Sequence, residues 1–272
     1  MKQYFLMIWC LISMAGVAEA QRESPYKTNF KVDAPITAAG VGLTYYGLTL
    51  MMDKDGLTEE QISRLSKDDV IGFDRFSAGY DSETAKKISD FPFYGSFALP
   101  LTLVFNQNVK GNFGQVFGLY VQTMAVTGAL FTMTSGLSPR TRPLVYSPDV
   151  EMSEKTRANA RNSFYAGHTT AAAGASFFFA KVFHDFNPDS PARPFVWAGA
   201  AAVPAVVGYY RLKAGKHFLS DNILGYAIGA ATGILVPQLH KKTNQSGFTL
   251  NPTLIPTFAG TASQGANLSY TF

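Results

Sequence analysis

Apolar residues in this chain come in long, nearly uncharged runs separated by short polar connections. Runs of this length, rich in Ala, Gly, Phe and Leu, are typical of buried or membrane-facing helices rather than of strands. A charged segment at residues 53–90 interrupts the pattern, and Thr58 followed by Glu59 and Glu60 within it predicts a capped helix start. We expect six helices, over residues 35–52, 91–106, 113–134, 168–184, 194–212 and 221–239.

The pattern changes at the C-terminal end of the chain. Apolar and polar residues alternate within 248–251 and again within 266–272, on either side of a segment with glycine at both ends, 260–265. A period of two on both sides of a glycine-containing turn predicts a β-hairpin. The last strand is similar to strands of outer-membrane proteins, but one hairpin cannot close a barrel. We therefore expect the hairpin to pack on the helices.

The first twenty residues have the pattern of a signal peptide. Lys2 precedes an apolar run at residues 4–14, and Ala18-Glu19-Ala20 forms a small-residue cleavage site. The one cysteine of the chain, Cys10, lies in the apolar run. We therefore divide the chain into a signal peptide (1–20), a helical domain (21–242) whose residues 21–33 form an exposed lead-in, and a tail with the hairpin (243–272).

Composition bears on the compartment and on partners. The chain is 47% hydrophobic and only 15% charged, below the roughly 25% charged residues of an average soluble domain. Residues 115–134 and 222–239 carry no charge over nearly the length needed to cross a bilayer. We expect membrane embedding and keep a soluble periplasmic bundle as the alternative. A site that faces outward requires either that one early element, which we expect to be the short 91–106, does not span, or that the signal peptide stays as an anchor. The net charge of +4 is scattered, so no nucleic-acid partner is indicated.

Three separated segments carry candidate chemistry, and the first centres on His217. Asp221 follows it by four residues and Arg211 precedes it by six. On a helix, residues four apart share a face, so Asp221 would reach the His217 ring and fix its tautomer. The planar guanidinium of Arg211 suits phosphate oxygens. A surface hydrogen bond between the histidine and the aspartate is the simpler alternative.

The other two segments also suit an anion. Gly167 and His168 stand at the start of an Ala- and Phe-rich helix, where free backbone N–H groups attract phosphate. Gly167 would let the backbone approach the anion closely. Arg140 and Arg142-Pro143 follow an apolar run and could form an anion clamp. An incidental capping histidine and an ordinary flanking loop are the alternatives.

The order and spacing of these motifs resemble the type 2 phosphatidic acid phosphatase superfamily. That group includes bacterial lipid phosphatases, class A acid phosphatases and vanadium haloperoxidases. The resemblance spans roughly residues 34–240 and implies an all-α fold with a six-helix core bundle. The matching residues, in order, are Arg142-Pro143, Gly167-His168, Arg211, His217 and Asp221.

The resemblance implies a role for each matching residue. His217 would attack phosphorus and form a phosphohistidine, and Asp221 would orient it. His168 would protonate the leaving oxygen and then activate water. Phosphoryl transfer depends mainly on positioning and charge neutralisation, which such a site supplies without a metal. The equatorial oxygens would be held by Arg142, Arg211 and the backbone N–H of Gly167.

Three positions depart from the family pattern, at Ser135, at Tyr165-Ala166 and at Tyr210. Ser135 stands seven residues before Arg142, where the family has a phosphate-binding lysine. Arg140 and Lys216 are candidates to replace that lysine. Ala166 replaces a serine, and the lost hydroxyl would lower the rate about ten- to a hundredfold.

The sequence therefore predicts a metal-independent phosphatase without a cofactor, acting on a phosphorylated lipid or a small phosphate ester. Two alternatives remain: a non-catalytic membrane or binding protein that retains the fold, and a haloperoxidase that uses vanadate. His184 and His240 belong to no motif and are not expected to be catalytic. We expect an exported protein of the bacterial cell envelope, with its site facing the periplasm.

Overall fold

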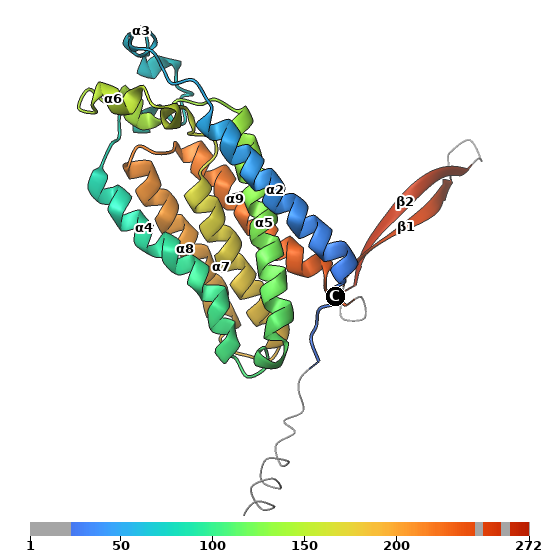
Figure 1. The fold of residues 1–272 in the computed structure, drawn as a ribbon. Coiled ribbons are helices and arrows are strands. Elements are labelled where there is room, and N and C mark those ends of the chain that lie inside the picture. Colours follow the sequence, from blue (N-terminus) through green and yellow to red (C-terminus); the bar gives the residue numbers. More distant parts are fainter. Residues whose placement is uncertain (1–22, 243–246, 257–261, 272) are drawn as a thin grey trace, which may run out of the picture.

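Six long helices form the body of the protein, as predicted from the apolar runs. The computed structural model describes residues 23–242, 247–256 and 262–271. The helices run up and down along one another as an all-α bundle (Figure 1). They are α2 (Phe30–Met52), α4 (Glu83–Ala98), α5 (Phe113–Leu137), α7 (Gly167–Phe186), α8 (Arg193–Lys213) and α9 (Leu219–Leu239).

One end of the bundle is covered by short helices and turns. Helices α3 (Glu59–Ser63) and α6 (Met152–Lys155) lie there (Figure 1). The predicted cap of α3 is confirmed, because the Thr58 hydroxyl accepts from the backbone N–H of Gln61 at 3.1 Å. Helices α2, α5 and α8 end beneath this cover and α4, α7 and α9 begin there, so six helix termini meet at one place. The short 3₁₀ segments are η1 (Lys67–Asp69), η2 (Arg75–Ser77), η3 (Leu99–Phe105), η4 (Lys110–Asn112), η5 (Pro143–Tyr146) and η6 (Ala158–Arg161).

Helix α7 is the central helix, in contact with α4, α5, α8 and α9. Close approach to α9 requires a glycine: a Cβ on Gly229 would lie 2.1 Å from the carbonyl oxygen of Thr170. Small residues allow such backbone contacts both in membranes and in tightly packed soluble bundles. Helix α7 is therefore held in register against α9, which fixes His168 relative to the start of α9.

The lead-in was predicted to be exposed, and this is wrong for Tyr26. Its side chain is 1% exposed and packs edge-on against Phe186. Its hydroxyl donates to the Asp185 carboxylate at 2.8 Å. A buried hydroxyl requires a partner, and Asp185 supplies one at the uncapped end of the bundle.

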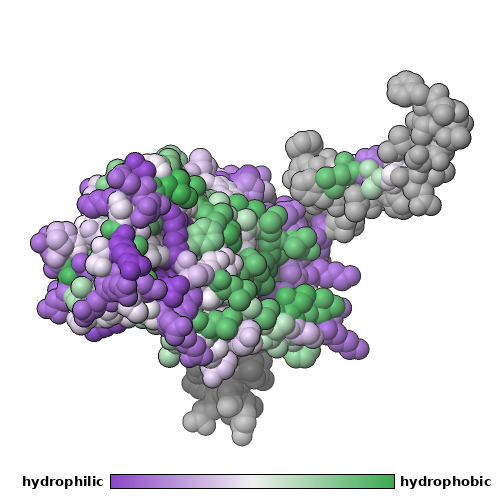
Figure 2. All heavy atoms as spheres, turned by 90° about the horizontal axis from the view of Figure 1, so that it is seen from above, coloured by the Kyte–Doolittle hydropathy of each residue, from purple (hydrophilic) through white to green (hydrophobic). Residues whose placement is uncertain are grey.

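Four described helical segments are long and apolar enough to cross a membrane: Glu83–Phe105, Lys110–Leu137, Arg193–Lys213 and Leu219–Leu239. The element expected to be too short is among them, because α4 begins at residue 83 and continues into η3. Large apolar side chains such as Phe91 and Phe195 are exposed on the outside of the bundle. Figure 2 shows hydrophilic residues over the capped end and hydrophobic residues over the adjoining flank.

The predicted hairpin is present, and the predicted packing is wrong. Strand β1 (Gly247–Pro256) pairs antiparallel with β2 (Ala262–Thr271), with Gly247 opposite Thr271. Figure 1 shows the hairpin extending away from the helices. The predicted signal peptide lies outside the described residues.

Candidate phosphate site

The three predicted segments meet at the capped end of the bundle. Arg142 follows α5, and Gly167 and His168 open α7. Arg211 lies in the last turn of α8, and His217 lies two residues before α9, next to its N-cap Phe218. Antiparallel helices therefore bring together residues that are up to 75 positions apart in the sequence.

His217 is buried and held by a single oriented hydrogen bond. Its side chain is 3% exposed, and its Nδ1 lies 2.6 Å from the backbone oxygen of Ser163. A carbonyl oxygen only accepts, so Nδ1 carries the proton and Nε2 keeps its lone pair. Burial, together with the charge of Arg142, lowers the pKa of His217 well below its usual value. The ring is therefore neutral, with Nε2 as its basic atom.

The predicted hydrogen bond from Asp221 to His217 is not formed among the described residues. Helix α9 begins at Leu219, so His217 precedes the helix and the four-residue spacing does not place both side chains on one face. The fully buried Asp221 carboxylate instead accepts from the Ser163 hydroxyl at 2.6 Å and from the backbone N–H of Phe218 at 2.9 Å. Asp221 thus orients His217 through Ser163, the residue whose carbonyl holds the ring.

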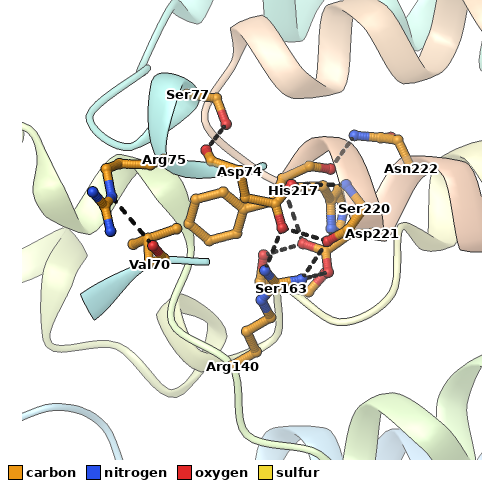
Figure 3. A network of polar contacts seen from close by, with 11 residues as sticks. Val70, Asp74, Arg75, Ser77, Arg140, Ser163, His217, Ser220, Asp221 and Asn222 are labelled. Atoms are coloured by element: carbon orange, nitrogen blue, oxygen red, sulfur yellow. Dashed lines mark hydrogen bonds and ion pairs between the residues drawn. The ribbon is translucent and has the colours of Figure 1, made fainter. Parts of the chain in front are cut away.

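Arg140 lies between two buried carboxylates. Its guanidinium pairs with Asp221 and, at 2.7 Å, with Asp74 (Figure 3). Ser220 donates to Asp74 from both its backbone and its hydroxyl. Burial raises the pKa of Asp74, but the Ser220 and Arg140 hydrogen bonds outweigh it and leave the pKa below its usual value. Both terminal nitrogens of Arg140 are occupied by Asp74, Ser220 and Asp221. Arg140 was expected to bind phosphate, and the structure instead gives it the role of holding Asp221 in place.

Arg211 and His168 are in direct contact. One terminal nitrogen of Arg211 approaches Nε2 of His168. Because a guanidinium is always a donor, this Nε2 accepts and carries no proton. The His168 ring also packs against Phe93, with ring centroids 4.1 Å apart. Asp90 pairs with Arg211 from 3.6 Å.

Two buried guanidinium nitrogens have no hydrogen-bond acceptor in the described part of the chain. They are Nε of Arg142 and Nε of Arg211. Arg142 uses one terminal nitrogen to donate to the Asn159 side chain at 2.9 Å and, at 3.3 Å, to the backbone oxygen of Asn162. Burial and the neighbouring Arg211 charge lower the pKa of Arg142 to about 10. Unsatisfied buried donors are rare in native proteins, so these two nitrogens are candidate donors to a bound anion.

Of the positions that depart from the family pattern, Ser135, Tyr165 and Ala166 are buried, and Tyr210 is half-buried. Ser135 is fully buried, and its hydroxyl has no hydrogen-bond partner among the residues that the structure describes. The backbone N–H of Ala166 donates to the backbone oxygen of Asp221 at 3.1 Å, so it is not free for a ligand. A Cβ on Gly167 would lie 2.4 Å from the Phe131 ring, which gives a packing reason for glycine there.

Lys216 remains a candidate cation for the site. Burial and the charge of Arg142 lower its pKa to about 8. Its backbone N–H donates to the backbone oxygen of Arg211 at 3.1 Å. The nearby carboxylate of Glu83 acts in the opposite direction and raises the pKa of Lys216.

Lys54 is a residue that the sequence reasoning missed. It follows α2, and its ammonium donates to Asn162 Oδ1 at 2.8 Å, to the Ser138 oxygen at 3.3 Å and to the Ser135 oxygen. A lone lysine about 80 residues before the first motif gives no local signal. Only the packing of α2 along α5 shows its relation to the site.

The two histidines without a motif, His184 and His240, lie at the opposite end of the bundle from His217. His184 contacts Arg193 and Trp197, and His240 pairs with Asp33 at 3.0 Å. Across the described ranges, no group of three His, Cys, Asp or Glu side chains is arranged to hold a metal ion.

Comparison with known proteins agrees with the motifs. Residues 116–245 match the model of the PAP2 superfamily. The chain is similar to a transmembrane PAP2-type phosphatidylglycerolphosphate phosphatase from Bacillus subtilis, with 18% identity and a TM-score of 0.43. That alignment covers 72% of this chain and 93% of the other. No curated protein matches the sequence significantly.

The family match includes Ser135, Arg142, His168, His217 and Asp221, all of which the bundle gathers at its capped end. The segment 116–245 therefore matches the PAP2 superfamily, as the order of the motifs predicts.

Proposed function

We propose that this protein hydrolyses phosphate monoesters through a phosphohistidine on His217, without a metal or cofactor. The observation that carries the proposal is the pair of unpartnered guanidinium nitrogens of Arg142 and Arg211 in the buried site. They lie in a site that also holds a neutral His217 and His168. Fixed donors aimed at a phosphoryl group stabilise the charge that develops during transfer.

The reaction has two steps in this proposal. Before the first step, the bound phosphate dianion lets His168 take up a proton from solvent and become an imidazolium. In the first step, Nε2 of His217 attacks phosphorus, the P–O bond of the ester breaks, and the His168 imidazolium gives this proton to the leaving oxygen, which leaves His168 neutral. In the second, His168 takes a proton from water, the hydroxide attacks the phosphohistidine, and inorganic phosphate leaves. Phosphate oxygens take over the Arg211 donors, which frees Nε2 of His168 to carry its proton.

The substrate is proposed to be a lipid phosphate because an apolar groove adjoins the site. Helices α8 and α9 border a cavity of about 340 Å³ on the flank of the bundle. Thr169, next to His168, and Gly208 and Leu212, on either side of Arg211, line the end nearest the site. A phosphate at the arginines would therefore leave an attached hydrocarbon chain in the groove.

The direction of α2 determines which side of the membrane the site faces. This helix begins at the uncapped end and packs along α5 to the capped end. We place the site on the periplasmic side. If all six helices cross the membrane, a periplasmic site places Phe30, at the start of α2, on the cytoplasmic face. In that arrangement the site and the N-terminal segment lie on opposite sides of the membrane, so they cannot both be exported.

A non-catalytic oxyanion-binding protein is the second candidate, and Ser135 is the observation that favours it. The family lysine is absent there and the serine hydroxyl is unpartnered. Such a protein would bind phosphate or vanadate without turnover. Halide oxidation with vanadate and peroxide has no specific support among the described residues.

Replacing His217 by glutamine tests the proposed nucleophile. We expect His217→Gln to lower phosphate release from an aryl phosphate by about a thousandfold or more, because the attacking nitrogen is lost. The assay includes a chelator. His184→Gln, the same change at the opposite end, should retain wild-type turnover. A His217→Gln protein with more than a tenth of wild-type activity would exclude the mechanism.

The protonation state of His217 is the second test. We expect its ring to stay neutral well below pH 6.5, because burial and Arg142 lower its pKa. In the unfolded chain the His217 imidazole is protonated near pH 6.5, whereas in the folded protein it stays neutral. The free energy of unfolding therefore keeps its full value above that pH and decreases as the pH falls below it. Imidazole NMR of the four-histidine chain, assigned with single variants, measures this directly. Titration of His217 at pH 6.5 or above contradicts the account.

A bulky residue in the groove tests the lipid substrate. We expect Ala205→Phe to lower kcat/KM for a long-chain phosphatidate about tenfold, the effect of displacing roughly two buried methylenes. Hydrolysis of an aryl phosphate should not change. Ala202→Phe is the matched control, since Ala202 is exposed on the same helix outside the groove lining. Equal loss on both substrates, or none on the lipid, argues against a chain in this groove.

A further inference from the structure

We propose that Lys54 is a positioning residue that replaces, from another helix, the lysine missing at Ser135. The inference rests on the proposed phosphatase function. Lys54 lies outside the segment matched by the family model, residues 116–245. It nevertheless reaches the backbone of the residue that stands at the lysine position of the family.

The ammonium of Lys54 is fully used by protein oxygens. It has three N–H donors, and three acceptors surround it: the backbone oxygens of Ser135 and Ser138 and the side-chain oxygen of Asn162. Two of these acceptors belong to the end of α5, where helix carbonyls lack partners and favour a positive charge. Lys54 therefore does not contact phosphate; it acts through the residues that it holds.

Asn162 connects Lys54 to the residues of the site. It is 4% exposed, accepts from Lys54 at 2.8 Å and donates to the backbone oxygen of Met51 at 3.1 Å. Its own backbone oxygen accepts from Arg142 at 3.3 Å. The next residue, Ser163, holds His217 by its carbonyl. A displaced Asn162 thus moves both the phosphate-binding Arg142 and the nucleophile.

The charge of Lys54 also bears on the site. Burial lowers its pKa, and the nearby charges of Arg161 and Arg142 lower it further. The ammonium therefore lies within electrostatic reach of Arg142 and adds positive potential where a phosphate dianion would bind. The buried, unpartnered hydroxyl of Ser135 supplies no charge of its own. Lys54 restores a cation at the end of α5 that the sequence at residue 135 lacks.

The test compares four variants of the full-length protein. Lys54→Met removes the charge and keeps the apolar stem, whereas Lys54→Arg keeps the charge. The double variant Lys54→Met/Ser135→Lys restores a lysine at the family position. Lys31→Met is the matched control, an exposed lysine at the other end of α2. For each we measure kcat/KM on an aryl phosphate, the inhibition constant of vanadate, and the thermal unfolding midpoint.

We expect Lys54→Met to lower kcat/KM by about tenfold or more and to weaken vanadate inhibition to a similar extent, because Asn162 loses the charged hydrogen bond that keeps Arg142 and His217 in place. Lys54→Arg should keep most of both, the double variant should recover much of both, and Lys31→Met should equal the wild type. Wild-type values for Lys54→Met overturn the proposal. The proposal is also overturned if Lys54→Met loses activity together with a lowered thermal unfolding midpoint, and if neither Lys54→Arg nor the double variant restores the activity. If the wild-type protein has no phosphatase activity, the proposed function is refuted instead. Comparing vanadate binding by the wild type and by Lys54→Met then still tests the role of Lys54.

Discussion

The site depends on one buried charge arrangement, the guanidinium of Arg140 between the carboxylates of Asp74 and Asp221. Both carboxylates are fully buried, and a buried charge is tolerated only with a partner and further hydrogen bonds. Arg140, Ser220 and Ser163 supply these bonds. Because Asp74 comes from the capping segment and Asp221 from α9, the arrangement joins the cover of the bundle to its core. Removing one member would leave a buried charge without its counterion.

The orientation of His217 follows from this arrangement. Asp221 is fixed by Arg140 and holds the Ser163 hydroxyl, and the Ser163 carbonyl then selects the His217 tautomer with a free Nε2. On the opposite side, Arg142 and Arg211 repel any positive charge on the ring and keep unused donors of their own. In the proposed mechanism, these two arginines would neutralise the charge of a phosphate dianion bound beside His217. Binding the anion relieves the mutual repulsion of the two arginines.

The pattern of apolar residues predicted the bundle because long apolar runs form helices almost independently of which apolar residues they contain. The element predicted at 91–106 was expected to be too short to span, and only its predicted start was wrong. Lys86 and Lys87 lie in the first turns of α4 and interrupt the apolar pattern there. The motifs likewise predicted that Arg142, His168, Arg211 and His217 lie together, and the bundle brings them to its capped end because each stands at or near a helix end. The sequence could not show that Asp221 serves Ser163, since this depends on α9 beginning after His217. Lys54 was missed because its relation to Ser135 exists only through helix packing.

The central claim is that His217 carries the phosphoryl group, and trapping that intermediate tests it most directly. His168→Gln should still be phosphorylated by an aryl phosphate, whose leaving group needs no acid, but should lose the base that activates water. Quenching this variant in alkaline denaturant, followed by peptide mass spectrometry, should locate phosphate on His217. Phosphate on another residue, or no phosphorylated residue from a variant whose parent enzyme turns over, would contradict the account.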